Sequence, residues 1–363
     1  MQIKKITGED CKKLRSLWEE VFYEDSEQFT DYYFEHKAEK NIGYVIGDDA
    51  CDAMMFRTPY AVQIGEEQRK LSYIVGVATR KECRHRGYMR TLLNHAMQEM
   101  YRDKEPFTFL MPANPAIYEP FGFRYVYERE EWSYIEEVLS EKIQALEAEE
   151  EDSELQAASI EGREEKQAIK DRDILNGIFS VSKLRKEVPQ YSVMEKLAEF
   201  SNRILKENFQ IYVHRDIAYY EMQLKESTAQ NGDIYVLLEN GIIKAFFLYA
   251  KEENKVYIQE VLKEKGTDLD FLQKQEHKKP IIMARIIHLE EMMKLVRSKE
   301  EREVILKVTD ELLPGNNGVF QWKITQEGSK VLRLEDNTKV SDRISIEQLA
   351  PLILKNVFLN EIV

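Results

Sequence analysis

A chain of 363 residues is too long for one compact core, so its length predicts two or three domains. Hydrophobic residues make up 43% and charged residues 33%, as in soluble globular proteins, and no apolar run approaches the ~20 residues that span a bilayer. The formal net charge of −14 argues against non-specific nucleic-acid binding and favours cationic partners.

The cysteines and histidines indicate neither a disulfide framework nor a metal site. Cys11, Cys51 and Cys83 are scattered, and no pair has metal-ligand spacing. The six histidines form no H-x-x-x-H pattern. The opening MQIKKITGEDCKKL lacks the apolar stretch of a secretory signal. We therefore expect a reduced, cytoplasmic protein without a bound metal.

The first block of the chain has the pattern of a mixed α/β domain. Apolar residues at helical spacing predict helices within residues 1–40 and over 88–102. Dense apolar runs predict strands, at 43–47, 52–65, 71–80 and 106–112. A strand, a tight turn, a helix and a second strand in this order favour neighbouring parallel strands.

Three further segments follow. Residues 136–172 are acidic and strand-poor, which indicates a helical or mobile surface connection. Residues 173–275 repeat the strand-and-helix pattern, and the pair Asn240-Gly241 predicts a hairpin within them. Residues 280–363 predict a strand running into a helix, then antiparallel strands with PGNNG as their turn, and a last helix leading into an apolar tail.

The stretch RHRGYMRTLL, residues 84–93, is a cationic turn ahead of the second predicted helix. A turn between a strand and a helix directs several backbone N–H groups to one point, and the helix N-terminus adds partial positive charge, which suits a phosphate or pyrophosphate. Gly87 permits an unusual backbone angle and close approach of a ligand. The basic residues around Gly87 are Arg80, Lys81, Arg84, His85, Arg86 and Arg90. A solvated basic turn or a nucleic-acid patch would have the same spacing.

Two ordered segments carry a family resemblance. The run R-x-x-G-x-M, preceded by the strand GVAT, resembles motif A of the GNAT (GCN5-related N-acetyltransferase) superfamily, which holds the pyrophosphate of acetyl-coenzyme A. Arg84 and Gly87 match that motif, while Met89 stands where glycine or alanine is usual. Downstream, NPAIYEPFGF resembles the superfamily's N-x-x-A-x-x-Y-x-x-x-G-F region, and its corresponding residues are Asn114, Tyr118, Gly122 and Phe123, with Ala116 slightly early. Two matches about 30 residues apart are more specific than either alone.

The wider layout is similar to the Eis-like (enhanced intracellular survival) subgroup of the superfamily. The resemblance covers the whole chain and implies an α/β (α+β) fold of tandem GNAT domains with mixed central sheets plus a C-terminal sterol-carrier-protein-like α+β domain. We expect an acetyltransferase domain with the acetyl-coenzyme A site at 1–145, a degenerate GNAT-like domain at 146–276 and the sterol-carrier-protein-like domain at 277–363. The subgroup forms hexamers, so the resemblance also implies a homo-oligomer.

The implied activity is acetyl-coenzyme A-dependent N-acetylation of a primary amine, by direct attack in a ternary complex. The acceptor would be aminoglycoside-, polyamine- or lysine-like. Backbone groups of Val77 and Thr79 would bind the pantetheine arm of the coenzyme. The other expected coenzyme-binding residues are Arg84, His85, Arg86, Gly87, Tyr88, Met89 and Asn114.

The resemblance also implies two catalytic groups. Tyr118, whose reference pKa lies near ~10, would be the general acid that protonates the leaving thiolate. The terminal carboxylate of Val363 would take the amine proton, which fits the apolar tail VFLNEIV. Glu24, Asp25 and Glu361 would attract a cationic amine. Each of these residues has a structural alternative: a core aromatic, a tail that only packs, or solvated acids.

Two other functions stay open at this stage. A coenzyme A- or acyl-CoA-binding protein without efficient turnover would keep Arg84 and Gly87 but would not need Tyr118. An RNA-binding module would use the basic turn, but the patch is short and lacks interleaved aromatic residues. The sequence therefore favours an acetyltransferase that binds acetyl-coenzyme A and an amine, with no nucleic-acid or membrane partner.

Overall fold

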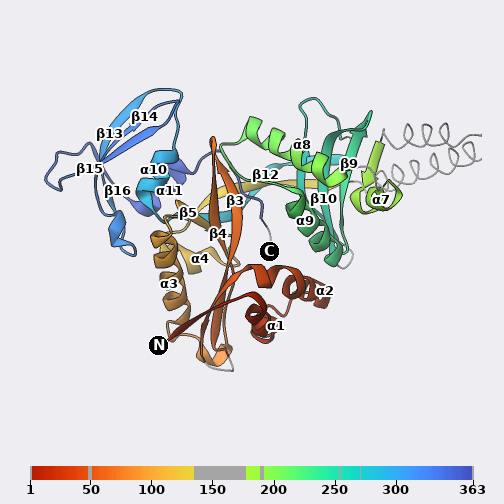
Figure 1. Ribbon diagram of the computed structural model, residues 1–363, viewed down its shortest axis with the longest axis horizontal. Coiled ribbons are helices and arrows are strands. Elements are labelled where there is room, and N and C mark those ends of the chain that lie inside the picture. The colour runs from red at the N-terminus through yellow and green to blue at the C-terminus, as the bar shows by residue number, and fades with distance from the viewer. Residues whose placement is uncertain are drawn as a thin grey trace, which may run out of the picture. The chain divides into compact units, whose positions relative to one another are not determined.

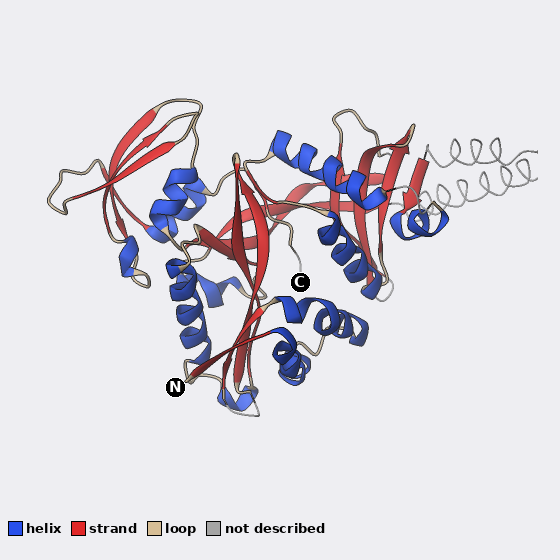
Figure 2. Ribbon diagram, viewed as in Figure 1, coloured by secondary structure: helices blue, strands red, loops and turns tan. Residues whose placement is uncertain are grey.

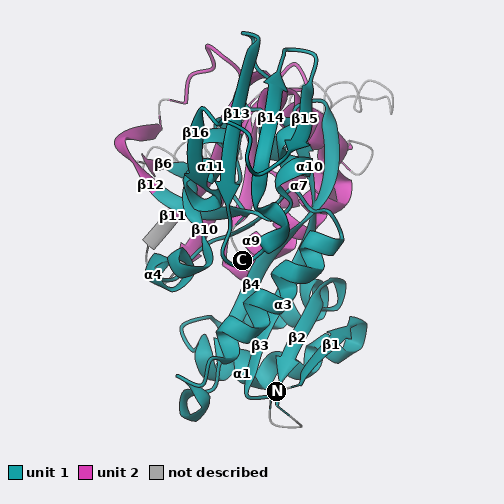
Figure 3. Ribbon diagram, turned by 90° about the vertical axis from the view of Figure 1, so that its left-hand side faces the viewer, with its two compact units in different colours: residues 1–129, 208–214, 280–363 teal, residues 130–207, 215–279 magenta. Residues whose placement is uncertain are grey.

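The structure is a computed structural model, and it describes residues 2–47, 51–134, 177–188, 192–252, 255–269 and 271–361. The predicted acidic connection at 136–172 and the candidate base Val363 lie outside the described residues. The chain divides into two compact units (Figure 3). The first comprises Met1–Arg129, Asn208–His214 and Pro280–Val363, and the second comprises Glu130–Glu207 and Arg215–Lys279.

The N-terminal part of the first unit combines short helices with long strands (Figures 1 and 2). Its helical elements are η1 (Gly8–Leu14), α1 (Arg15–Val21), α2 (Glu27–Tyr32), η2 (Tyr33–Lys37), η3 (Ala38–Lys40), η4 (Lys81–Cys83), α3 (Tyr88–Arg102), α4 (Pro115–Tyr118) and η5 (Glu119–Phe121). Its strands are β1 (Ile3–Thr7), β2 (Ile42–Ile46), β3 (Ala53–Ile64), β4 (Glu67–Thr79), β5 (Phe107–Leu110) and β6 (Arg124–Tyr134).

A mixed sheet forms the centre of the first unit. Among the described residues its strand order is β1-β2-β3-β4-β5-β12-β6, with β8 (Ile211–Val213) paired to β3 and β17 (Val357–Phe358) paired to β8. Strands β4 and β5 run parallel, as the strand-turn-helix-strand pattern predicted. Strand β12 (Leu272–Ile286) runs antiparallel to β5. Segments far apart in the sequence thus share one sheet.

The helical prediction for residues 1–40 was wrong at the start of the chain. Ile3–Thr7 is strand β1, antiparallel to β2 from Ile3↔Ile46 to Thr7↔Ile42. The segment is short, and its backbone partners lie on a strand that comes much later. The local sequence therefore carries little sign of the pairing.

Helices cover both faces of this sheet. Neighbouring residues of a strand point to opposite faces. Met55 of β3 packs in the core cluster under α3, while the next residue, Phe56, packs against Trp18 of α1 with ring centroids 6.5 Å apart. The helix predicted over 88–102 is confirmed at those bounds. Its buried side chains are Leu92, Leu93, Ala96, Met97 and Met100.

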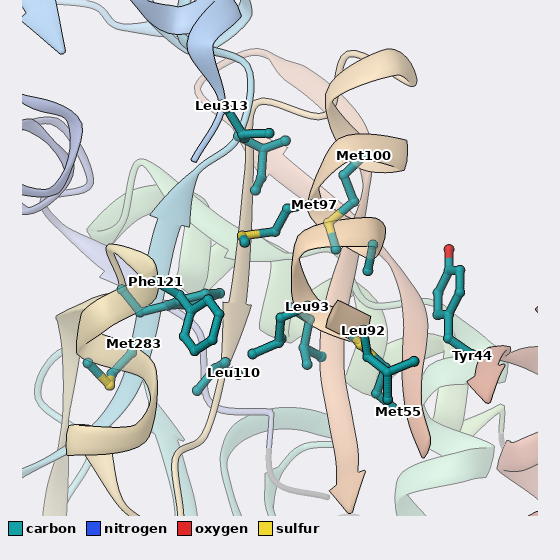
Figure 4. Packing of buried hydrophobic residues seen from close by; sticks show 14 of the residues in the cluster. Tyr44, Met55, Leu92, Leu93, Met97, Met100, Leu110, Phe121, Met283 and Leu313 are labelled. Atoms are coloured by element: carbon teal, nitrogen blue, oxygen red, sulfur yellow. The ribbon is translucent and has the colours of Figure 1, made fainter. Parts of the chain in front are cut away.

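One hydrophobic cluster joins α3, the sheet and the C-terminal segment (Figure 4). Leu93 of α3, Leu110 of β5 and Phe121 of η5 are N-terminal members. Met283 of β12 and Leu313 are C-terminal members. Burying a side chain of this size contributes roughly 1.5–3 kcal/mol. Residues from the last quarter of the chain therefore complete the N-terminal core.

The C-terminal part of the first unit is a small α+β structure. Its elements are α10 (Leu289–Leu295), β13 (Arg302–Thr309), η6 (Pro314–Asn316), β14 (Gly318–Ile324), β15 (Ser329–Leu334), β16 (Asp342–Ser345) and α11 (Ile346–Ile353). The strand order is β15-β14-β13-β16, antiparallel except for the parallel pair β13 and β16. The predicted run from strand β12 into helix α10 and the predicted PGNNG turn are confirmed.

The second unit contains a separate sheet with strand order β11-β10-β9-β7. Its elements are β7 (Gly177–Ser180), α7 (Val181–Glu187), α8 (Val193–Asn208), α9 (Ile217–Ala229), β9 (Asp233–Glu239), β10 (Ile242–Glu252) and β11 (Lys255–Lys263). The predicted hairpin is confirmed between β9 and β10, where Asn240 and Gly241 have φ values of 50° and 72°. None of the helices in the described parts of either unit is long and apolar enough to cross a bilayer.

Candidate active site

Strand β4 contains a bulge just before the basic turn. Two of its residues, Gly76 and Val77, stand opposite one residue of β3, Met55, because the register shifts there. Gly76 has a φ of 60°, and a Cβ added to it would lie 2.6 Å from the ring of Trp18. Glycine is therefore required both by the backbone angle and by the neighbouring ring. The bulge sets the direction in which the end of β4 points.

We expect Gly76→Ala to lower the free energy of unfolding by about 3 kcal/mol. The alanine would strain the left-handed backbone conformation at this position, and its Cβ would also clash with the rigid ring of Trp18. Gly65→Ala is the matched control, since Gly65 has a φ of 58° but nothing within 4 Å of an added Cβ. It should cost only about 1 kcal/mol. Urea denaturation of both variants measures the difference, and equal losses would contradict the role of Trp18.

Strands β4 and β5 separate beyond Tyr73. In the described structure Tyr73↔Phe109 is the register pair that they share, whereas β3 accompanies β4 as far as Thr79. The backbone groups of Val77 and Thr79 on the β5 side therefore lack a neighbouring strand. Strand backbone groups need hydrogen-bond partners, so this edge can bind a ligand through its main chain. The sequence prediction put the pantetheine contacts at these two residues.

The basic turn connects this strand end to α3. His85 and Gly87 both have positive φ, 63° and 78°, and Gly87 is the N-cap of α3. A Cβ added to Gly87 would meet nothing within 4 Å. The helix ladder begins with the Thr91 N–H, which donates to the Gly87 carbonyl over 3.0 Å. The amides of the first turn, those of Tyr88, Met89 and Arg90, have no carbonyl four residues earlier in the helix.

Exposed cationic side chains surround this helix start. Arg84 donates to the Thr79 carbonyl over 3.3 Å, and Arg86 donates to the Glu82 carbonyl over 3.0 Å, yet both side chains are exposed. Arg80 differs, because it pairs with the Glu20 carboxylate at 2.6 Å. First-turn amides, the partial positive charge of a fifteen-residue helix and nearby guanidinium groups together suit a polyanion.

A short turn holds the candidate acid Tyr118. The Asn114 side chain accepts a hydrogen bond from the Ala116 N–H over 3.1 Å, so Asn114 is the N-cap of α4. Tyr118 ends this helix, is half-buried and packs edge-on against Phe123, with ring centroids 6.0 Å apart. Burial alone raises the pKa of Tyr118 to about 12. Its hydroxyl is therefore protonated at neutral pH.

The strand end, the basic turn and Tyr118 pack around the same core. The side chains of Val77, Tyr88, Met89 and Tyr118 are all partly buried against the cluster of Figure 4. The guanidinium of Arg90 also lies 5.2 Å from the ring centre of Phe121, three residues after Tyr118. The residues predicted from the two motifs thus meet around one hydrophobic cluster.

The two acidic candidates near the first helix, Asp25 and Glu24, differ in their surroundings. The Trp18 indole N–H donates to the Asp25 carboxylate over 2.8 Å, and the same ring packs on Gly76. Burial raises the pKa of the Asp25 carboxyl, and the indole hydrogen bond partly offsets this. Asp25 as a whole is exposed to solvent, so the raised pKa reflects only the local burial of its carboxylate beside the Trp18 indole. Glu24 is exposed and acts on Asp25 through its charge.

The C-terminal tail is packed as far as the structure describes it. Val357 and Phe358 of β17 pair in parallel with β8, and Phe358 contacts the rings of Tyr127 and Phe209 at 5.4 Å and 5.0 Å. Glu361 is only 1% exposed, so this candidate is buried rather than at the surface.

Sequence reasoning missed Gly76, Trp18 and the contact of Arg90 with Phe121. A glycine within an apolar strand run often marks a bulge, so Gly76 carried a usable signal. The contacts of Trp18 and Arg90 depend on tertiary packing, which one sequence does not reveal. In the parts of the chain that the structure describes, no group of three or more histidine, cysteine or acidic side chains is arranged to bind a metal.

Comparison with known proteins identifies two domains. Residues 2–126 match the family model of the acetyltransferase (GNAT) domain, and residues 289–362 match that of the sterol carrier protein domain. No curated protein matches the sequence significantly.

Solved structures resemble the chain over almost its whole length. A probable N-acyltransferase from Enterococcus faecalis is 16% identical with a TM-score of 0.69, covering 98% of this chain and 90% of that one. A GCN5-related N-acetyltransferase from Anabaena variabilis is 15% identical with a TM-score of 0.67, covering 97% and 90%. Eis1 from Mycobacterium abscessus is 10% identical with a TM-score of 0.64, covering 98% and 90%.

At these identities the structural likeness establishes the fold. The predicted α/β (α+β) class, with a GNAT fold, mixed sheets and a C-terminal sterol-carrier-protein-like domain, is confirmed. The chain therefore contains an acetyltransferase (GNAT) domain over residues 2–126 and a sterol carrier protein domain over residues 289–362, and it shares the fold of these solved structures.

Proposed function

We propose that this protein transfers the acetyl group of acetyl-coenzyme A to a primary amine. The observation that carries the proposal is the shared position of three features around one core: the end of β4 that β5 does not accompany, the N-terminus of α3 and the protonated Tyr118. The first two suit an extended, phosphate-bearing ligand, and the third supplies a proton donor.

The coenzyme would bind along the main chain. The amides from His85 to Met89 would hold the pyrophosphate, with Arg84 and Arg86 adding positive charge. The space around Gly87 supports this, because a Cβ added there would meet no side chain or backbone of another segment within 4 Å, and a phosphate needs that space. Backbone groups of Val77 and Thr79 would hold the pantetheine arm and leave the thioester near Tyr118.

The reaction would proceed by direct attack. The amine nitrogen forms a bond to the thioester carbonyl carbon, the C–S bond breaks, and the Tyr118 hydroxyl gives its proton to the leaving sulfur. The ammonium proton would pass to the Val363 carboxylate. The tail packed through Glu361 supports a fixed position for the residues that precede this carboxylate.

The acceptor would be a cationic amine of the aminoglycoside, polyamine or lysine class. The net charge of −14 and the Asp25 carboxylate beside Trp18 favour such a substrate. We expect Glu24 and Glu361 to contribute to this field, and we expect the enzyme to act as a homo-oligomer in the cytoplasm.

Thiol release from acetyl-coenzyme A, measured with a panel of polyamines, aminoglycosides and lysine peptides, tests the proposal. The expected result is amine-dependent release together with an acetylated product of matching mass. Calorimetric heat with acetyl-coenzyme A but no amine-dependent release would favour a coenzyme-binding protein without efficient turnover. No heat at all would contradict coenzyme binding itself.

Extending the chain by one glycine after Val363 should lower kcat by at least about tenfold, because each extended residue shifts the carboxylate by ~3.5 Å. Anchoring of the tail at β17 leaves little chain to absorb the shift. The affinity for acetyl-coenzyme A should not change. Parallel assays with the glycine added at the N-terminus provide the control, and equal kcat values for all three proteins would exclude Val363 as the base.

A further inference from the structure

Arg285 of β12 is a buried arginine that binds the turn carrying Tyr118. It is 1% exposed. Its Nε donates to the Phe121 carbonyl over 2.6 Å, and its Nη1 donates to the Ile286 carbonyl over 2.7 Å. Its Nη2 donates to Oδ1 of Asp310 over 2.7 Å. Each guanidinium nitrogen therefore has an acceptor, and one of these acceptors lies three residues after Tyr118.

The partner of Arg285 is fixed by the C-terminal domain. Asp310 follows β13, and its side chain is 1% exposed. Oδ1 also accepts the backbone N–H groups of Leu312 and Leu313, at 3.0 Å and 3.1 Å, and Oδ2 accepts from the Asn316 side chain at 2.9 Å. A carboxylate with this many donors has one stable position. The guanidinium is thus held both by a carbonyl of the Tyr118 turn and by a carboxylate that is itself fixed in place.

A second arginine repeats the arrangement. Nη1 of Arg124 donates to the carbonyls of Glu119 and Phe123, over 3.0 Å and 2.7 Å. Nη2 of the same side chain lies 3.5 Å from the Glu347 carboxylate of α11, again in the C-terminal domain. Three carbonyls just after Tyr118 therefore accept bonds from arginines that also pair with C-terminal carboxylates.

The turn itself has little independent stability. Helix α4 has four residues, which is too short to persist without outside contacts. Gly122 has a φ of 80°, and a Cβ added there would lie 3.2 Å from Nε of Arg285, so the backbone lies directly against the guanidinium. A displaced guanidinium would therefore displace the turn and the Tyr118 side chain with it.

We propose that Arg285 and Asp310 are positioning residues for Tyr118, so that a buried ion pair between strand β12 and the C-terminal domain sets the location of the catalytic hydroxyl. The inference rests on the proposed role of Tyr118 as general acid. A buried ion pair adds little stability compared with apolar packing, so its use here points to geometry. The sterol carrier protein domain thereby becomes part of the acetyltransferase site.

Arg285→Lys is the main test. Lysine keeps the charge, but its single Nζ cannot reach Phe121, Ile286 and Asp310 together. We expect kcat to fall about 10- to 30-fold with the KM for acetyl-coenzyme A within about twofold, since misplacement of a reacting group acts on turnover. In a Tyr118→Phe background the same substitution should cost less than about twofold, because its effect passes through the tyrosine.

Arg57→Lys is the matched control. Arg57 is 3% exposed and pairs with the Glu105 carboxylate, at a site built from β3, β4 and the end of α3. Arg57→Lys should lower thermal stability to about the same extent as Arg285→Lys, while kcat should stay within about twofold of wild type. Comparison of the two lysine variants separates loss of stability from loss of positioning.

A second readout does not depend on turnover. In protein labelled with 3-fluorotyrosine, the ¹⁹F resonance missing from Tyr118→Phe belongs to Tyr118, and it should shift in Arg285→Lys but not in Arg57→Lys. If wild type acetylates no amine, the proposed function fails, and this resonance alone decides the positioning claim. Additive losses in the double mutant, or an unmoved resonance, would overturn the claim. If Arg285→Lys does not fold, Arg124→Lys, at a half-exposed site, takes its place in both measurements.

Discussion

Tyr118→Phe is expected to lower kcat by about 10²- to 10⁴-fold, the usual contribution of a general acid. Phenylalanine keeps the ring that packs on Phe123 and removes only the hydroxyl that would protonate the leaving thiolate. The dissociation constant for acetyl-coenzyme A should stay within about threefold, because the proposed coenzyme contacts are mainly main-chain groups of another segment. Steady-state kinetics and calorimetry on the same preparation measure the two quantities.

The pH profile provides an internal check on this assignment. The pKa of Tyr118 is raised to about 12, above its unfolded value near ~10, so the fold favours the protonated hydroxyl. Loss of this proton should therefore not reduce kcat below pH ~10. The contribution of the raised pKa to the free energy of unfolding is fully present below pH ~10 and is lost as the pH rises through ~12. Tyr125→Phe, at a 37% exposed tyrosine of β6, is the control and should leave kcat unchanged. A Tyr118→Phe enzyme with nearly full kcat would make Tyr118 a packing residue.

Gly87→Val is expected to weaken acetyl-coenzyme A binding by about 100-fold or more. A β-branched residue is strongly disfavoured at a φ of 78°, so the turn must change its backbone angle, and the first-turn amides of α3 then move. The valine side chain also enters space where the protein itself has no atom within 4 Å. Both effects act on the ligand more than on the fold, and calorimetric titration with acetyl-coenzyme A measures them.

Gly65→Val separates strain from binding. Gly65 connects β3 and β4, has a φ of 58° and likewise has nothing within 4 Å of an added Cβ. The Gly65→Val variant should lose about as much free energy of unfolding as Gly87→Val, about 1–2 kcal/mol, and should bind the coenzyme with unchanged affinity. If both valine variants bind acetyl-coenzyme A as wild type does, the pyrophosphate does not lie at the N-terminus of α3.

Elements whose formation depends on residues close together in the sequence were predicted correctly. Helix α3 was predicted at its observed bounds because its apolar stripe repeats without interruption, and the Asn240-Gly241 turn because that pair favours positive φ. The two motifs identified the acetyltransferase (GNAT) domain because their order and spacing are recognisable in the sequence. They also located Tyr118 and Gly87, whose roles stay predictions.

The remainder depends on contacts between distant residues. Strand β1 was missed because its partner β2 comes much later, and the pairing of β8 with β17 joins residues 211–212 to 357–358. Arg285 lies in the apolar run PIIMARIIH, which predicted a strand but gave no sign of a carboxylate partner in a later loop. Tertiary geometry, rather than propensity, fixes such pairs.

The arrangement of β12 beside β5 affects how the protein is made. Leu110 pairs with Met283 and Phe107 with Ile286, so a nascent chain emerging from the ribosome must wait for the last third of its synthesis before β5 gains its second neighbour. Until then an apolar strand edge is exposed, which is a target for chaperones and a site for aggregation. A truncated acetyltransferase domain should accordingly be insoluble unless the C-terminal segment is co-expressed.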